Sequence, residues 1–330
     1  MRKKLAWFGK ALISGMLAFS MLSVFCIFYY NVPVHASTSD GATDYSWQKN
    51  KFYSRGTEGF ALGKTNNEGY LNSFDYQDGM NIDVLMMGSS HTEGYNVGMS
   101  ESMSAQLGSM LPNDVVYNIG TSAHGLNTNA SNLSNAIKKY KPTKYVVIEA
   151  PSIEFSEEAL NLVLEDKNPE LSSHSNGIVG FLQNIPFLRL MYAQLKAFLG
   201  NLKSNDNVTS SNIAENASYE TYSLFLEKLN NIAKSEGVKL IIVYHPALSL
   251  NEDGSASTVA DKEFCNSFNK NCEENGIIFL DMSSRFLNEY EQNAVLPHGY
   301  SNTSVGQGHL NKHGHKMIAE ELYKLMEENK

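Results

Sequence analysis

The chain has 330 residues and a formal net charge of −9 at neutral pH. The first 36 residues contain four basic side chains and no acids, so the rest of the chain carries −13. A body this acidic repels phosphate backbones, which argues against nucleic acid as a partner and against binding of anionic lipid through the folded body. Hydrophobic residues make up 42% of the chain, enough for a sizeable core.

Residues 1–36 read as a targeting segment. A basic start, Met1 to Lys4, precedes an apolar stretch without charge from Ala11 to Val34. Val34-His35-Ala36 places small residues at the positions that a signal peptidase recognises, which favours cleavage of a signal peptide after Ala36. The stretch is also long enough to span a bilayer as a signal anchor. Both alternatives predict a body outside the cytoplasm, secreted or anchored to the outer face of the membrane.

Residues 37–80 read as a linker and an N-terminal extension with no clear periodicity. We expect Gly59 to Gly63 to pack against the edge of the following domain.

Residues 81–330 alternate between strand and helix patterns. Short apolar runs predict five strands: Ile82–Met87, Val115–Ile119, Tyr145–Ile148, Val238–Tyr244 and Ile277–Leu280. Amphipathic stretches predict five helices: Ser100–Leu111, Leu126–Tyr140, Tyr219–Glu236, Ala260–Asn275 and Lys312–Glu328. This alternation predicts a three-layer α/β/α sandwich around a five-stranded parallel sheet in flavodoxin-like order, with the site at the carboxyl ends of the strands. Residues 154–216 interrupt the alternation and predict a helical insertion over the rim of the sheet.

No metal or other cofactor is predicted. Cys265 and Cys272 lie two turns apart on one predicted helix, beyond disulfide reach, and we expect both to be free. His309, His313 and His315 are spaced so that they could meet a metal, but no acid is paired with them.

Three segments rich in small and polar residues follow strands or precede the last helix. Gly-Ser-Ser-His-Thr-Glu-Gly occupies residues 88–94, directly after the first strand of the domain. Tyr-Asn-Ile-Gly-Thr-Ser-Ala-His-Gly occupies residues 117–125, directly after the second. Gly-His-Leu-Asn-Lys-His-Gly-His occupies residues 308–315. A serine on a tight strand-to-helix turn projects its hydroxyl from the edge of the sheet, and backbone N–H groups beside it can hold an oxyanion.

Together these segments resemble the SGNH/GDSL hydrolase family from residue 82 to the C-terminus. The resemblance implies Ser90 as the nucleophile and His309 as the base. It implies an oxyanion hole made by the N–H groups of Ser90 and Ala123, with Gly120 as the alternative donor.

More narrowly, Gly-Ser-Ser-His with His-Leu-Asn resembles a subgroup of proteins associated with bacterial cell-surface polysaccharides, some of them O-acetyltransferases. The resemblance implies an exported serine esterase or O-acyltransferase that acts through an acyl-Ser90 intermediate, with an acylated glycan or acyl donor as partner. The rival hypothesis is a non-catalytic carbohydrate-binding or assembly protein on a degenerate SGNH fold.

Two departures from the family pattern favour that rival. The acid that usually lies three residues before the histidine is replaced by Gly306, and the asparagine of the third family block by Ile153. Asp281, at the end of the fifth strand, is our first choice for the missing acid, although it could instead cap the turn that follows. Glu149 and Glu154 are the alternatives. Losing this group can cost ~10⁴-fold in rate.

Four polar residues near strand ends are expected to contact substrate. They are His91, Asn118, Glu149 and His245.

Overall fold

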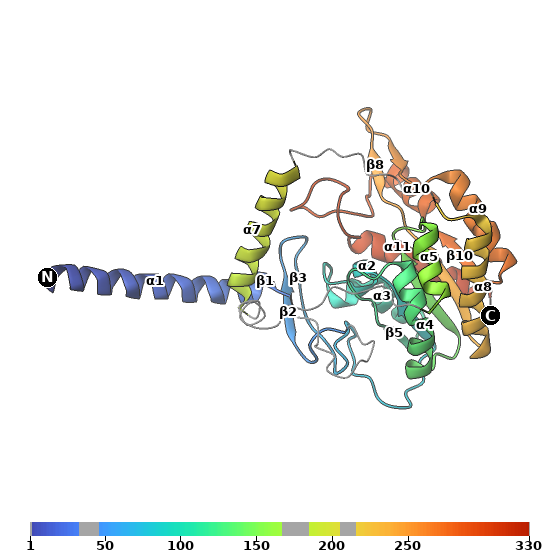
Figure 1. The fold of residues 1–330 in the computed structure, drawn as a ribbon, viewed down its shortest axis with the longest axis horizontal. Helices are drawn as coiled ribbons and strands as arrows, with labels where there is room; N and C mark the ends of the chain where they lie inside the picture. Colours follow the sequence, from blue (N-terminus) through green and yellow to red (C-terminus); the bar gives the residue numbers. More distant parts are fainter. Residues whose placement is uncertain (1, 33–45, 167–184, 205–215, 330) are drawn as a thin grey trace.

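The structure is a computed structural model, and it describes residues 2–32, 46–166, 185–204 and 216–329. Its centre is a parallel sheet in the order β10-β7-β6-β4-β5. Helices surround this sheet (Figure 1). The strands are β4 (Val84–Met87), β5 (Val116–Asn118), β6 (Tyr145–Ala150), β7 (Lys239–Tyr244) and β10 (Ile278–Asp281). Numbered along the domain this order is 5-4-3-1-2, so the predicted flavodoxin-like sheet is confirmed.

Helices cover both faces of the sheet because alternate strand residues point to opposite sides. Leu85 and Met87 belong to one buried cluster, whereas Val84 and Met86 belong to the other. The first cluster is covered by α4 (Leu126–Tyr140), α5 (Glu157–Leu164), α8 (Tyr219–Ser235) and α9 (Lys262–Glu274). The second is covered by α3 (Met103–Met110), α10 (Ser283–Asn293) and α11 (Lys312–Glu328). The predicted three-layer sandwich is therefore confirmed.

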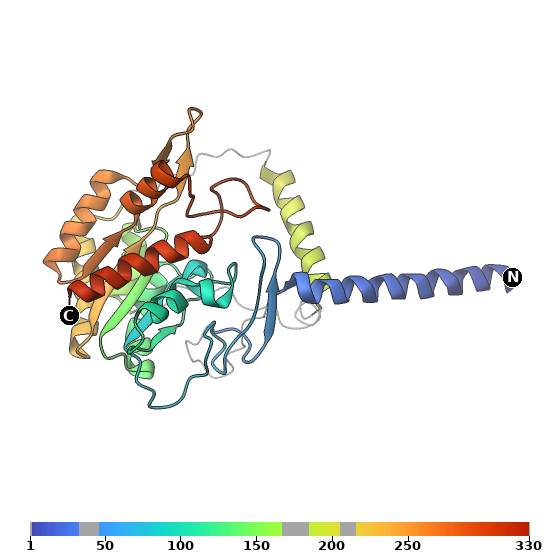
Figure 2. The ribbon, with the colours of Figure 1, turned by 180° about the vertical axis from the view of Figure 1, so that it is seen from behind.

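The N-terminal extension forms a second, smaller sheet. Helix α1 (Arg2–Tyr29) leads directly into β1 (Tyr30–Asn31), which pairs with the hairpin β2 (Phe52–Arg55) and β3 (Ala61–Lys64). Figure 2 shows α1 projecting away from the body while the hairpin lies against it. Near the turn of the hairpin, the N–H of Gly59 donates to Asn302 Oδ1 at 2.8 Å, so this turn is fixed to the loop before α11.

The predicted insertion contains two described helices, and they lie in different places. Helix α5 packs between α4 and α8 on a face of the sheet. Helix α7 (Pro186–Ser204) instead contacts α1 and β1 (Figure 1). Neither helix covers the rim of the sheet as expected, and residues 167–184 and 205–215 lie outside the described residues.

Several short elements were not predicted, because each is shorter than the window in which periodicity is visible. They are α2 (Ser90–Glu93), the 3₁₀ turn η1 (Met99–Glu101), β8 (Leu248–Leu250) and β9 (Ala256–Thr258). Helix α10 was also missed. The free cysteines were predicted correctly: Cys265 and Cys272 are buried and unpaired.

Candidate active site

Ser90 lies at the carboxyl edge of the sheet, on the turn between β4 and the single-turn helix α2. Ser89 caps this helix, and its hydroxyl accepts the N–H of His91 at 3.2 Å. Ser90 is the first residue of the helix, where an N–H has no partner inside the helix. The turn therefore presents both a hydroxyl and an N–H at the same edge.

His309 meets Ser90 from the loop before α11. Its Nε2 lies 2.8 Å from Ser90 Oγ, although the two residues are 219 positions apart. The position of the loop follows from the cap of α11, where the Asn311 side chain accepts the N–H groups of His313 and Gly314. The serine and the histidine singled out in the sequence are thus within hydrogen-bond distance.

Glu58 lies behind the histidine ring. Its Oε2 is 2.7 Å from His309 Nδ1, and its Oε1 accepts the backbone N–H of His309 at 2.6 Å. Burial opposes ionisation of this carboxyl, but the hydrogen bonds from His309 and the charge of Arg55, 3.9 Å away, lower the pKa of Glu58 below its usual value. An ionised carboxylate at Nδ1 fixes the ring with its lone pair on Nε2, facing the serine.

The glycine at position 308 makes room for this carboxylate. Its φ is +102°, and a Cβ there would lie 2.2 Å from Glu58 Oε1. A side chain at this position is therefore excluded both by the backbone conformation and by the contact.

Asp281 is not the acid behind His309, which corrects the first choice made from the sequence. Its Oδ1 accepts the N–H of Ser283 at 2.8 Å and also the Ser283 hydroxyl, so it caps the turn after β10. The alternatives fail as well: among the described residues, Glu58 is the carboxylate that bonds the His309 ring, whereas Glu149 pairs with His245. The sequence did not mark Glu58, because the extension that carries it has no pattern that links it to the last loop.

Two backbone N–H groups are candidates for an oxyanion hole. The N–H groups of Ser90 and Ala123 have no hydrogen-bond partner among the described residues. Ala123 has φ +67°, a left-handed conformation that is strained for any residue with a Cβ and that recurs at functional sites. Gly120, the alternative donor, is excluded because its N–H donates to Asn118 Oδ1 at 2.8 Å. Ile153 is buried in the core, and its side chain has no hydrogen-bond donor.

A buried acid holds the loop that carries Ala123. Glu93, at the end of α2, accepts hydrogen bonds from the Ser122 hydroxyl and from the indole N–H of Trp47. Burial raises the pKa of Glu93 to about 7 despite these hydrogen bonds. The extension therefore supports the site at a second point, through Trp47.

A second buried acid, Glu149, holds the turn that carries Ser90. It accepts the N–H and hydroxyl of Ser89 and of Thr92 at distances from 2.7 to 3.2 Å, and it pairs with His245 Nε2 at 2.5 Å. Burial opposes ionisation, but His245 and these hydrogen bonds lower the pKa of Glu149 far below its usual value. A fully buried, ionised carboxylate thus fixes the residues on both sides of the nucleophile.

Three of the four predicted substrate contacts are wrong for one physical reason, which is burial. The side chains of Asn118, Glu149 and His245 are at most 1% exposed and are used inside the protein. Asn118 donates to the backbone carbonyl of Thr92 at 2.8 Å and so braces α2. His91 lies nearer the surface, and its Nδ1 accepts the N–H of Leu310 at 3.1 Å.

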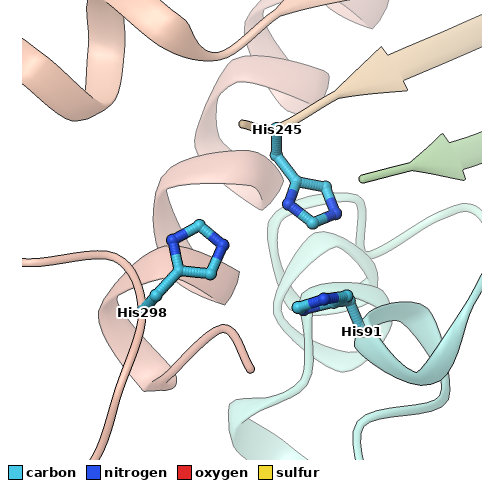
Figure 3. A group of neighbouring side chains, drawn as sticks. All are labelled: His91, His245 and His298. Atoms are coloured by element: carbon cyan, nitrogen blue, oxygen red, sulfur yellow. The ribbon is translucent and has the colours of Figure 1, made fainter. Parts of the chain in front are cut away.

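His91, His245 and His298 form a cluster in which one nitrogen of each lies within 4.8 Å of the others (Figure 3). Three neutral imidazoles would suit Zn²⁺. However, Nδ1 of His91 accepts the Leu310 N–H, so a neutral ring carries its proton on Nε2 and offers no lone pair to a cation. The cluster therefore supplies two metal donors rather than three, and we assign no metal to it.

The other histidines considered for a metal do not converge. His313 is exposed, whereas His315 is buried and accepts the Met103 N–H on Nδ1 at 3.2 Å. Burial lowers the pKa of His315 to about 3 and that of His298 to about 3.

The protein is therefore an α/β protein with a flavodoxin-like parallel sheet, and a serine, a histidine and a glutamate lie in hydrogen-bonded series at the carboxyl edge of that sheet. The sequence matches no protein-family model and no curated protein.

Solved structures to which the chain is similar include two esterases and a putative lipolytic protein. The acetyl xylan esterase AlAXEase is 13% identical, with 74% of this chain and 99% of that chain covered and a TM-score of 0.44. A putative lipolytic protein of the G-D-S-L family from Desulfitobacterium hafniense is 16% identical, with 74% and 99% covered and a TM-score of 0.40. A two-domain esterase active on acetylated mannans is 11% identical, with 75% and 49% covered and a TM-score of 0.42. At these identities the similarity concerns the fold.

Proposed function

We propose that the protein is an exported serine esterase or O-acyltransferase that acts on acyl esters of a cell-surface or extracellular glycan through an acyl-Ser90 intermediate. The observation that carries the proposal is the continuous series from Glu58 through His309 to Ser90, with contacts of 2.7 and 2.8 Å. The missing acid and the missing asparagine favour a non-catalytic binding protein, and Glu58 supplies a carboxylate in place of that acid.

In the first step Ser90 Oγ attacks the ester carbonyl carbon while His309 Nε2 takes the hydroxyl proton. The carbonyl oxygen becomes an oxyanion, which the N–H groups of Ser90 and Ala123 stabilise. Glu58 stabilises the imidazolium that forms. The intermediate then collapses, the C–O bond to the leaving alcohol breaks, and His309 returns the proton to that alcohol.

In the second step an acceptor hydroxyl attacks the acyl-enzyme while His309 again takes the proton. Water as acceptor releases a carboxylic acid, and a sugar hydroxyl yields a new ester. The Ser90 hydroxyl is regenerated when His309 returns the proton to Oγ. With two backbone donors and no asparagine in the oxyanion hole, we expect a slower catalyst than one with three donors, by about 10²–10³-fold.

Hydrolysis of p-nitrophenyl acetate by the full chain in detergent tests the chemistry. Wild-type protein should turn over, and Ser90→Ala should reduce the rate to background, whereas Ser249→Ala, an exposed serine on β8, should not change it. A fluorophosphonate probe should label wild type and not Ser90→Ala. If Ser90→Ala retains full turnover, or if the probe fails to label a folded wild-type protein, the proposal is wrong.

The glycan substrate needs a separate assay. Acetate release from acetylated xylan or mannan is compared with ester transfer to an added sugar acceptor. If the protein hydrolyses p-nitrophenyl acetate but neither releases acetate from a glycan nor transfers it to a sugar, it is a serine esterase of another substrate class, and the proposed glycan substrate is wrong.

A further inference from the structure

The end of helix α1 is built into the folded body. Asn31 pairs with Ser54, and Tyr30 with Arg55, so β1 forms an edge strand of the hairpin sheet. The Ser54 hydroxyl donates to the carbonyl of Ile27 at 2.9 Å, which satisfies one of the carbonyls left free at the helix end. Cys26 is only 1% exposed, so one side of the last turns of α1 packs against the body, whereas Phe25 and Phe28 are each 57% exposed.

This packing bears on whether residues 1–36 are cleaved from the chain. Cleavage after Ala36 would remove Tyr30 and Asn31 and leave Ser54 without the two backbone groups it bonds. Gly56 also fits the retained helix, because a Cβ there would lie 2.6 Å from the ring of Tyr29. These contacts exist only in an uncleaved chain.

The rest of α1 is suited to a bilayer. From Ala6 to Tyr29 it has 24 residues, of which the apolar window is only 6% buried. At 1.5 Å per residue the segment is ~36 Å long, enough to cross a hydrocarbon core of ~30 Å. Tyr29 is the last residue of this segment and Tyr30 the next, at the end where aromatic side chains favour the membrane interface.

Helix α7 presents an apolar face on the side of this span. Phe187 contacts Phe19, within the span, with ring centroids 5.6 Å apart. At 100° per residue, Met191 and Leu195 lie on the same face as Phe187, with Tyr192 beside them. These three side chains are 54%, 55% and 52% exposed. Large apolar side chains that are half exposed next to a membrane span indicate a lipid contact.

The charge of α7 is opposite to that of the body. Its sequence has three basic residues, Arg189, Lys196 and Lys203, and no acid, whereas the chain after residue 36 carries −13. Arg189 lies on the far side of the helix from Met191, near Tyr30 and Tyr95 of the body. Helix α7 therefore lacks the acidic side chains that argue against contact with anionic lipid elsewhere in the chain.

We propose that α1 is retained as a membrane anchor locked to the body through β1, and that α7 lies on the bilayer surface and contacts lipid through Met191, Tyr192 and Leu195. The proposal rests on the proposed export of the protein but not on its enzymatic activity. It also places the candidate site near the membrane. Glu58 lies in the hairpin turn, three residues beyond Arg55, the partner of Tyr30, so the two positions are at most ~10 Å apart along the chain at ~3.3 Å per residue.

The lipid contact is tested in the full chain reconstituted into phosphatidylcholine–phosphatidylglycerol liposomes. The native cysteines are buried, so a fluorophore that reports polarity can be attached to Leu195→Cys. Leu224→Cys on α8 is the matched control, since Leu224 is 56% exposed and Leu195 55%. We expect the label at residue 195 to be blue-shifted and quenched severalfold more by brominated lipid than the label at 224. Equal quenching at the two positions would overturn the contact.

The anchor is tested by the intact mass of the protein extracted from membranes of the expressing cells. A mass that includes residues 1–36 supports retention, and a chain that begins at Ser37 overturns it. Ser90→Ala should likewise retain residues 1–36 and should show the same quenching as wild type. Wild-type protein that gives these signals but does not turn over p-nitrophenyl acetate would therefore count against the proposed function alone.

Discussion

Glu58 Oε2 lies 2.7 Å from His309 Nδ1, and this contact joins two residues 251 positions apart. Glu58 comes from the hairpin of the N-terminal extension, whereas His309 comes from the last loop of the sandwich. The extension therefore completes the candidate site, and the pairing of β1 with β2 joins this extension to α1.

Replacing Glu58 by Gln should lower kcat on p-nitrophenyl acetate by about 10²–10⁴-fold. The amide cannot act as the negative partner of Nδ1, so the imidazolium that forms during attack loses its stabilisation. Asp281→Asn, which removes the acid favoured from the sequence, should change kcat by no more than about twofold. The reverse ranking, with Asp281→Asn the more damaging variant in folded protein, would show that the acid is assigned wrongly.

The sequence was sufficient for the sheet and for two members of the site. Strands such as Tyr145–Ala150 are continuous apolar runs, and the segments around Ser90 and His309 carry local motifs, so short windows reveal them. The third member depends on a contact that no local window contains. Gly306, where an acid is usual, showed that something was missing but not where it came from.

Polar residues at strand ends were the other source of error. The sequence pattern around Glu149 does not distinguish a glutamate that faces a substrate from one that is buried beneath the nucleophile. Only the packing decides, because an ion without exposure must be satisfied by donors from several elements. For Glu149 those donors are Ser89, Thr92 and His245.

Gly308→Ala should reduce kcat nearly as much as Glu58→Gln while leaving most of the protein folded. The new Cβ would lie 2.2 Å from Glu58 Oε1, so the carboxylate must move away from the histidine. Gly254→Ala is the matched control, because Gly254 also has a positive φ, +82°, but nothing within 4 Å of the added carbon. Similar activity loss in both variants would attribute the effect to backbone strain rather than to the displaced acid.

Glu149→Gln should destabilise the fold by about 3–5 kcal/mol in urea unfolding. The amide nitrogen of Gln would face N–H donors of Ser89 or Thr92, which would then be buried without an acceptor. Glu252→Gln, at an exposed position in the β8–β9 turn, should change stability by less than about 0.5 kcal/mol. An equally small effect at Glu149 would contradict its buried ionised state.

The free energy of unfolding of Glu93→Gln should increase progressively, relative to that of wild type, as pH rises from about 4.5 to about 7. The folded pKa of Glu93 is raised to about 7, so in this range the folded state holds a proton that the unfolded state has released. The free energy of unfolding of the wild type therefore falls by up to about 1.4 kcal/mol per pH unit because of Glu93. Gln does not titrate, so the variant does not lose stability in this way. Urea unfolding of both proteins across this range measures the difference. A difference independent of pH would mean that Glu93 is ionised throughout.

The opposite pH dependence is expected from His298. Burial lowers its folded pKa to about 3, below the ordinary value of 6.5, so between these values the unfolded state binds a proton that the folded state excludes. This contribution is fully present above pH ~6.5 and is lost as pH falls towards 3, by up to about 1.4 kcal/mol per pH unit. His298→Phe removes the titration, and its ring can pack edge-on against Phe286 as the imidazole does at 5.8 Å. Relative to wild type the variant should therefore gain stability steadily between pH ~6.5 and ~4 in urea unfolding. His313→Phe, at an exposed position, should show no such trend. If the free energy of unfolding of His298→Phe instead changes with pH in parallel with that of wild type, the His298 imidazole is protonated in the folded protein.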